Sequence, residues 1–229
     1  MSIVSIIRRK ERNRAAIDFT LDYHAHILPG CDHGSDSLET SQKQIAMAKA
    51  AGIKTICATP HFYPNRDTTH SFLLRRQLSY EKLSPYLVKS DPQILLGAEV
   101  LICDAIENMD ELYSLCLEGT NELLIEMPFY KWPSSIWATI YHLNDREDIR
   151  PVIAHAERYP AENIELLIRE GISLQLNVDC LLKPFKRKRY FSWIENGYVA
   201  YLGSDIHTTG ANYQDWIKCK NAVNAFCSR

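Results

Sequence analysis

Short apolar runs alternate with longer segments of helical periodicity along almost the whole chain. The apolar runs are rich in β-branched residues and end at glycine, proline or polar residues, as is typical of strands covered on both faces. We expect strands over residues 17–23, 54–59, 93–100, 122–127, 151–155, 173–178 and 198–203. We expect helices over residues 37–51, 68–89 with an interruption near Pro85, 104–115, 134–145, 161–170, 187–196 and 212–227.

Strict alternation of strand and helix predicts a parallel sheet in an α/β protein. We expect the sheet to close into a distorted (β/α)7 barrel resembling a TIM barrel, with an open doubly wound sheet as the alternative. No linker or change of composition divides residues 17–229, so we expect one domain there. The first strand is not followed by a glycine-rich phosphate loop, which argues against a nucleotide-binding fold.

Residues 1–16 form a basic N-terminal extension, in which an apolar stretch precedes the basic residues Arg8, Arg9, Lys10, Arg12 and Arg14. A secretory signal has its charge before the apolar stretch, so this segment is not one. We expect a solvated tail, with a basic amphipathic helix on an anionic membrane surface as the alternative.

The bulk composition points to an ordinary globular protein. The net charge of −2 gives no sign of nucleic-acid binding. No apolar run approaches the length of about 18 residues that a transmembrane segment needs. The seven cysteines include no CxxC pair and are expected to be free thiols in a reducing compartment. We therefore expect a cytoplasmic protein, either free or peripheral to the inner face of the membrane.

Histidines and carboxylates gather at the ends of the predicted strands. The carboxyl ends of parallel strands meet on one face of a βα fold, where ligands bind. Neutral imidazole and carboxylate are ligands of Zn²⁺, Mn²⁺ and Fe. The candidate ligands are His24, His26, His33, His61, Glu99, Glu126, His155, Asp205 and His207.

The spacing of these residues suits more than one ion. Residues two apart in a strand point to the same side, so His24 and His26 can aim at one ion, and so can Asp205 and His207. Glu99 could bridge two ions. This number of donors exceeds what one tetrahedral ion takes, so we expect two or three divalent metal ions. The alternative is a polar barrel mouth with solvated histidines.

Metal ions of this kind favour phosphate ester hydrolysis, because they lower the pKa of bound water and neutralise an oxyanion. Arg158, a turn beyond His155, could hold phosphate oxygens with two parallel hydrogen bonds. Arg66 is a weaker candidate. None of the cysteines has an arginine at the spacing that a cysteine-nucleophile phosphatase needs, and there is no G-x-S-x-G motif. A metal-activated hydroxide is therefore the expected nucleophile.

The motifs HAH, ATPH, GAE, LIEM, AHAERY and SDIH, in this order, resemble those of the polymerase-and-histidinol-phosphatase (PHP) superfamily of metal phosphoesterases. Within it, the chain is most similar to the bacterial capsule-type tyrosine phosphatases of the CpsB/CapC and YwqE kind. The likeness spans residues 22–207. It implies a PHP-type barrel and a trinuclear site of Mn, Fe, Mg or Zn held by the nine candidate ligands. It also implies that Arg158 binds phosphate.

Two positions depart from the pattern of the capsule-type enzymes. They typically have Asp-Asp-Gly where this chain has Asp32-His33-Gly34, and a basic residue where it has Asn212. His33 can still ligate a metal.

The resemblance implies a metal-dependent protein-tyrosine phosphatase, with manganese as the foremost metal. Its substrate would be a membrane-associated tyrosine autokinase that controls capsule and exopolysaccharide synthesis. A protonated group, for which His33 and His207 are candidates, would assist the leaving phenolate.

Two other functions remain open. One is a small-molecule phosphatase acting on histidinol phosphate or a sugar phosphate. The other is a non-catalytic module that binds phosphotyrosine tails, in which the basic run 186–189 attracts an acidic tail. Whether the protein is a monomer or a homo-oligomer also stays open.

Overall fold

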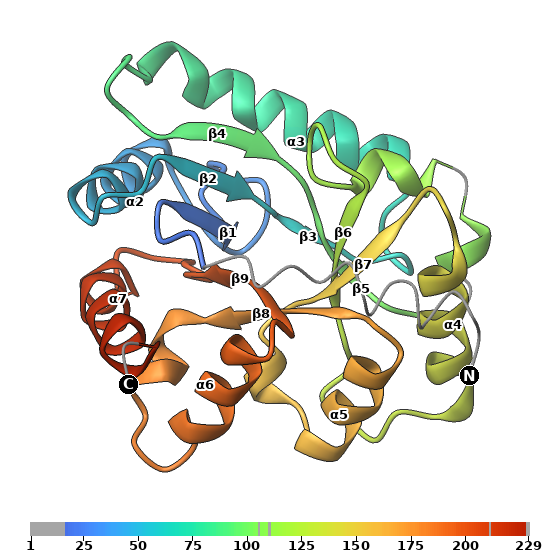
Figure 1. Ribbon diagram of the computed structural model, residues 1–229. Helices are drawn as coiled ribbons and strands as arrows, with labels where there is room; N and C mark the ends of the chain where they lie inside the picture. The colour runs from blue at the N-terminus through green and yellow to red at the C-terminus, as the bar shows by residue number, and fades with distance from the viewer. Residues whose placement is uncertain (1–16, 105, 110, 211, 228–229) are drawn as a thin grey trace.

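The computed structural model describes residues 17–104, 106–109, 111–210 and 212–227, and helices surround a central group of strands (Figure 1). The strands are β1 (Leu21–Ala25), β2 (Thr55–Ala58), β3 (His61–Phe62), β4 (Gln93–Leu96), β5 (Glu99–Leu101), β6 (Glu122–Glu126), β7 (Arg150–Ile153), β8 (Ser173–Asn177) and β9 (Val199–Gly203). The N-terminal extension, and with it the choice between a tail and a membrane-surface helix, lies outside the described residues.

The helices fall between the strands, close to their predicted positions. They are α2 (Leu38–Ala50), α3 (Thr69–Leu83), α4 (Ser134–Asp145), α5 (Ala161–Arg169), α6 (Arg187–Glu195) and α7 (Asn212–Cys227). Short 3-10 helices are η1 (Ser84–Tyr86), η2 (Ile106–Asn108), η3 (Leu112–Leu115), η4 (Ala156–Arg158) and η5 (Val178–Leu182). Within the described part of the chain, no helix combines the length and apolar character needed to cross a bilayer.

The strands pair in parallel in two sheets, with the orders β1-β2-β4 and β3-β5-β6-β7-β8-β9. Two chain segments contribute to both sheets, because β2 is followed by β3 after Pro60 and β4 is followed by β5 after Ala98. Pro60 has no N–H to donate, which accounts for the break in the first of these segments. The parallel α/β class expected from the sequence is confirmed.

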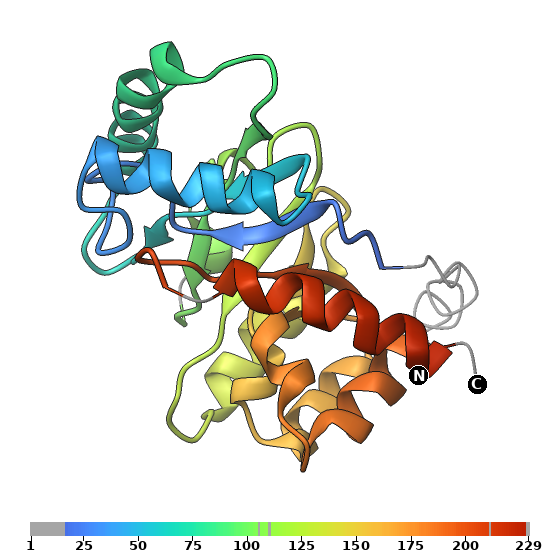
Figure 2. The same cartoon turned by 90° about the vertical axis from the view of Figure 1, so that its left-hand side faces the viewer.

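The first and last strands also lie side by side. The Asp205 N–H donates to the carbonyl of His24 at 2.7 Å, and the His26 N–H donates to the carbonyl of Ile206 at 3.0 Å. Figure 2 shows β1 running between α2 and α7, as in the first view. These bonds join the two sheets at one point, but they are not a ladder along the strands. Closure of the expected barrel therefore stays a prediction.

Both faces of the strands are buried, as the continuous apolar runs indicate. In β6 all five residues are buried. Leu123 and Ile125 join the large hydrophobic cluster that includes residues of the helices, whereas Leu124 packs in a smaller cluster with Tyr23 and Val152. Alternate residues of one strand thus serve two different apolar layers.

Residues 104–115 do not form the α-helix expected from the sequence. Within the described residues of this segment, only η2 and η3 are helical, and Glu111 before η3 has a left-handed φ of 59°. The apolar residues Ile106, Met109, Leu112 and Leu115 recur every three positions, which is the period of a 3-10 helix and not of an α-helix. The predicted α-helix was wrong, because apolar residues at a strict three-residue period stay on one face of a 3-10 helix but drift around an α-helix.

Candidate metal centre

The carboxyl ends of the strands bring the predicted ligands together. His24 lies in β1 and His26 just after it, while His61 begins β3 and Glu99 begins β5 in register with it. Glu126 ends β6, His155 follows β7, and both Asp205 and His207 follow β9. The two histidines outside the predicted set, His70 and His142, lie exposed in α3 and α4.

One carboxylate oxygen lies at the middle of this cluster. Glu99 Oε2 is 3.2 Å from His24 Nε2, 3.3 Å from His26 Nε2 and 3.0 Å from His61 Nδ1. Neither Glu99 Oε2 nor His61 Nδ1 makes a hydrogen bond with the described residues, although both atoms are buried. Buried polar atoms left without hydrogen bonds are costly, and a cation among them would satisfy them.

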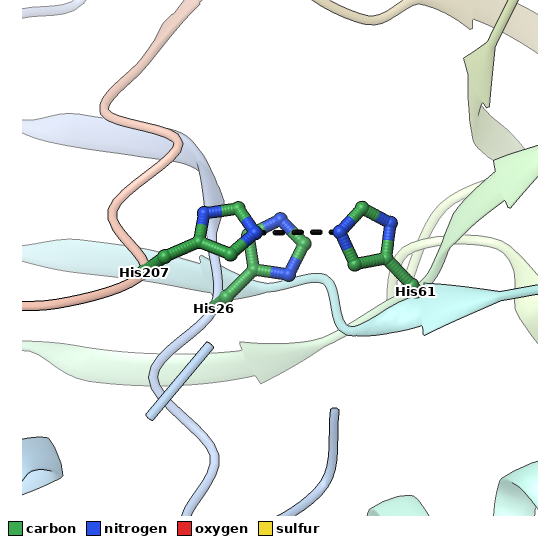
Figure 3. Close-up of side chains that lie close together, drawn as sticks. All are labelled: His26, His61 and His207. Atoms are coloured by element: carbon green, nitrogen blue, oxygen red, sulfur yellow. Dashed lines mark hydrogen bonds between the residues drawn. The ribbon is translucent and has the colours of Figure 1, made fainter. Parts of the chain in front are cut away.

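Three overlapping groups of donors are close enough to share an ion. The donor atoms within each group lie within 4.8 Å of one another, and the groups are His26, His61 and His207; His24, His26 and Glu99; and His61, Glu99 and Glu126. Figure 3 shows His61 facing His26 and His207 across a gap, with 3.3 Å between the Nε2 atoms of His61 and His207. The donor types, imidazole and carboxylate, fit Zn²⁺, Mn²⁺ or Fe.

His155 and Asp205 also contact this cluster. His155 Nε2 lies 2.8 Å from Glu99 Oε1 and 3.9 Å from Glu126 Oε1. Asp205 Oδ1 lies 3.6 Å from His24 Nε2 and 3.5 Å from His26 Nε2. The two residues have left-handed φ angles of 32° and 52°. Such angles are uncommon away from glycine and concentrate at functional sites.

His33 is the predicted ligand that stands apart. It is exposed at the edge of the cluster, where its ring stacks on that of His61 with 4.5 Å between centroids and lies 4.8 Å from that of His207. Like His155 and Asp205, it belongs to none of the three donor groups among the described residues, but unlike them it reaches the cluster only by contacts between rings.

Aromatic rings flank the cluster. Tyr63 stacks on His61 at 5.4 Å, and the largely exposed Phe129 lies 6.2 Å from the ring of His155.

Residues that the sequence did not single out orient the ligands. Asp32 Oδ2 lies 2.7 Å from His26 Nδ1 and accepts the His61 N–H at 2.9 Å. Gln175 Oε1 lies 3.2 Å from His24 Nδ1 and accepts the His155 N–H at 2.6 Å. Carboxylate and amide partners of this kind fix the orientation of metal-binding imidazoles. The alternation of β8 could have placed Gln175 among buried residues, but not beside these two histidines.

Arg158 is held at the cluster by a carboxylate. Its guanidinium donates to Asp205 Oδ2, which also accepts a hydrogen bond from the Asn177 amide at 3.1 Å. Asn177 is in turn oriented by Gln175, whose amide donates to it at 2.9 Å. Arg66, the weaker candidate, lies instead over the ring of Tyr63.

Two glycines allow the backbone to approach the ligands. A Cβ on Gly34 would lie 2.4 Å from His26 Cβ, and a Cβ on Gly203 would lie 2.6 Å from His24 Cβ. Any residue other than glycine at position 34 or 203 would therefore bring its Cβ too close to the side chain of a candidate metal ligand.

The electrostatics of the cluster suit cation binding. Burial raises the pKa of Glu126 to about 7, and the nearby charge of Glu99 acts in the same direction. Burial lowers the pKa of His207 to about 4, and His26 adds to the effect; burial also lowers the pKa of His33. Neutral imidazole is the form that binds metal ions, so these shifts favour ligation by His207 and His33. Burial acts to lower the pKa of His24 and His26 as well, but the carboxylates around them outweigh it and raise both values, so a proton occupies the place that a cation could take. The fold and this centre define a parallel α/β protein whose strand ends carry a buried set of metal-binding donors.

The chain belongs to the CpsB/CapC family of capsular polysaccharide synthesis, whose model matches residues 20–227. It is similar to the tyrosine-protein phosphatase YwqE of Bacillus subtilis, with 33% identity over 201 residues, 82% of this chain and 77% of that protein. It is also similar to the tyrosine-protein phosphatase CpsB of Streptococcus pneumoniae, with 30% identity over 207 residues and 82% of each chain.

A structural match supports the fold. Among solved structures, the chain resembles one from a study of YwqE from Bacillus subtilis and CpsB from Streptococcus pneumoniae, described there as unique metal-dependent tyrosine phosphatases. The TM-score is 0.71 at 24% identity, over 88% of this chain and 86% of the other. The resemblance to the capsule-type family expected from the motifs is thus confirmed.

Proposed function

We propose that this protein is a metal-dependent protein-tyrosine phosphatase. The observation that carries the proposal is the crowding of three imidazole nitrogens around Glu99 Oε2 at 3.0–3.3 Å, in a cluster where two buried donor atoms lack hydrogen bonds. Family membership supports the same function, because relatives that cover most of the chain carry the name tyrosine-protein phosphatase.

The metal ligands in this proposal are the nine residues named from the sequence, His33 included. Two or three divalent ions would bind, with manganese foremost and iron, zinc or magnesium as alternatives. When bound, such ions lower the pKa of water and neutralise charge on phosphoryl oxygens. Asp32 and Gln175 orient His26, His61 and His24 for this purpose.

The phosphate group of the substrate is held by Arg158 in our proposal. Its guanidinium is anchored by Asp205 at the edge of the cluster, and a planar guanidinium matches two phosphate oxygens at once. A protonated group assists the leaving phenolate in this proposal, and His33, at the exposed edge, and His207 stay the two candidates. Burial lowers the pKa of both rings, so each is neutral at pH 7, which is also the form that binds a metal ion.

The natural substrate in this proposal is a membrane-associated tyrosine kinase of capsule and exopolysaccharide synthesis. We place the enzyme in the cytoplasm, with residues 17–229 as one catalytic domain and residues 1–16 as an extension. We also propose that the two sheets together form the distorted PHP barrel, which the bonds between β1 and β9 support. Assembly into a homo-oligomer is compatible with these statements and is tested by light scattering.

A substrate panel tests the function. Metal-loaded protein is assayed with p-nitrophenyl phosphate, a phosphotyrosine peptide, histidinol phosphate and a sugar phosphate. We expect turnover of the first two with Mn²⁺ and loss of turnover in His155→Ala. Preference for the metabolites would identify a small-molecule phosphatase, and peptide binding without turnover would identify a binding module.

A further inference from the structure

A cavity of about 390 Å³ opens beside Arg158. Its wall includes Asn177, whose amide contacts Asp205 at 3.1 Å, so the cavity and the candidate metal centre share a boundary. The rest of the lining comes from η5 and from the segment that leads into α6, including Cys180, Lys183, Phe185, Lys186 and Tyr190. Apart from Arg158, no residue that lines this cavity has a role in the proposed hydrolysis.

The segment on its rim is strongly basic. Residues 183–189 are all exposed and contain five cationic side chains and no acidic one; they are Lys183, Lys186, Arg187, Lys188 and Arg189. The cavity lining also holds two carboxylates. Asp179 is paired with Lys183 at 2.7 Å, and Glu157 accepts the N–H of Asn177 at 3.2 Å. Among the described residues, Lys186 forms no such pair.

Phe185 adds an apolar surface beside these charges. Its side chain is 99% exposed, although burial of an aromatic ring is favourable. Tyr190, on the first turns of α6, is buried in the wall of the same cavity. The ring of Phe185 therefore offers apolar surface beside the cavity that a bound chain could cover.

We propose that this cavity binds the residue next to the phosphotyrosine in the substrate chain and selects an acidic side chain there. The inference rests on the proposed phosphatase activity. Because Arg158 itself lines the cavity, we place the residue next to the phosphotyrosine there; its Cα lies about 3.8 Å along the peptide from that of the phosphotyrosine. Lys186 attracts its carboxylate, the basic residues that follow add to the field, and Phe185 covers the peptide backbone.

The test compares substrates that differ only in the flanking residues. Three phosphotyrosine peptides of equal length carry Glu, Gln or Lys on both sides of the phosphotyrosine, and p-nitrophenyl phosphate serves as a substrate that has no flanking residue to place in the cavity. For the wild type we expect kcat/KM to fall in the order Glu, Gln, Lys. The differences in kcat/KM among the three peptides should become smaller as the salt concentration is raised, because exposed charges are screened.

Lys186→Glu should lower kcat/KM for the Glu peptide about fivefold, since single exposed ion pairs are weak. The change should appear in KM. Phe185→Ala should raise KM for all three peptides, and neither variant should alter turnover of p-nitrophenyl phosphate, which also reports correct folding. The matched control is Lys82→Glu, an exposed lysine of α3 on the opposite side of the strands from α6 (Figure 1).

The possible outcomes distinguish a failure of the cavity's role from a failure of the proposed phosphatase activity. Equal kcat/KM for the three peptides, or an unchanged preference in Lys186→Glu, overturns the role of the cavity while leaving the phosphatase intact. No turnover of any substrate by the wild type, p-nitrophenyl phosphate included, contradicts the phosphatase itself and the cavity's role with it. If Lys186→Glu instead abolishes binding to vesicles of phosphatidylglycerol and phosphatidylcholine and leaves peptide preference unchanged, the basic segment serves a membrane surface.

Discussion

Gln175 is a buried amide that contacts two of the candidate metal ligands. It contacts the imidazole of His24, which lies in β1, and the backbone N–H of His155, which follows β7. Gln175→Ala should weaken Mn²⁺ binding about 10- to 100-fold, as loss of an orienting partner does in other metal sites. Titration calorimetry measures the change, and Gln93→Ala, at an exposed position of β4, is the control. Unaltered affinity would contradict the orienting role.

Arg158 should act on the reacting phosphate and not on the metal. Arg158→Lys is expected to lower kcat for p-nitrophenyl phosphate about 100-fold, because lysine offers a point charge in place of two parallel donors. Metal content should equal that of the wild type. Arg66→Lys, at the arginine over Tyr63, should have little effect on kcat. Equal kcat values for both variants would remove Arg158 from the proposed mechanism.

Strand ends were enough to predict which histidines and carboxylates gather, since parallel strands bring their carboxyl ends together. Eight of the nine predicted ligands contact at least one other member by a polar atom, and His33 contacts the set by ring stacking. Asp32, Gln175 and Asn177 were missed because their roles depend on contacts between residues far apart in sequence. No local spacing encodes those contacts.

At the scale of the element, α3 depends on a reciprocal cap at its first turn. The Thr68 hydroxyl accepts the Ser71 N–H at 3.1 Å, and the Ser71 hydroxyl accepts the Thr68 N–H at 3.1 Å. Thr68→Ala should lower the free energy of unfolding by about 1 kcal/mol, because an N–H of the first turn loses its partner. Urea denaturation measures this, and Thr68→Ser should retain most of the stability. If the alanine and serine variants have equal free energies of unfolding, the hydroxyl cap does not contribute to the stability of α3.

Elements with ordinary periodicity and clear ends were predicted well. Both α4 and α7 have the bounds expected from the sequence. The strand expected over residues 93–100 is instead interrupted, as β4 and β5, and the helix expected over 104–115 is absent. Gly97 and Ala98 separate β4 from β5, which belong to different sheets, and Glu111 has a left-handed φ just before η3. The pattern of apolar residues within one segment does not show where a strand or helix is interrupted.

At the scale of the whole molecule, buried thiols should limit stability at alkaline pH. Burial raises the pKa of Cys116 and of Cys219 to about 12. Below about pH 8.5, the ordinary thiol pKa, both folded and unfolded states keep the protons. Above it the unfolded chain loses them first, so the free energy of unfolding should fall by up to about 1.4 kcal/mol per pH unit and thiol, until pH reaches about 12.

Thermal unfolding at a series of pH values measures this effect. The midpoint should stay level from about pH 7 to 8.5 and fall above that, more gently in Cys116→Ala than in the wild type. A midpoint that is level up to pH 10, or an identical slope in the variant, would contradict the link to these thiols.

The contact between the two sheets is also a property of the whole molecule. β1 and β9 are edge strands of the two different sheets, and backbone hydrogen bonds connect the two segments there. The residues that form these bonds include the candidate ligands His24, His26 and Asp205. The metal centre therefore depends on elements from both sheets. The sequence predicted the parallel class but could not specify how the sheets meet, because that depends on packing across the whole molecule.

The most direct test of the metal centre is the number of Mn²⁺ ions bound per chain at saturation, measured by elemental analysis after removal of free metal. We predict two or three ions for the wild type and at least one fewer for Glu99→Gln, whose carboxylate contacts four imidazoles. Fewer than two ions in the wild type, or the same number in the variant, would contradict a centre built around Glu99.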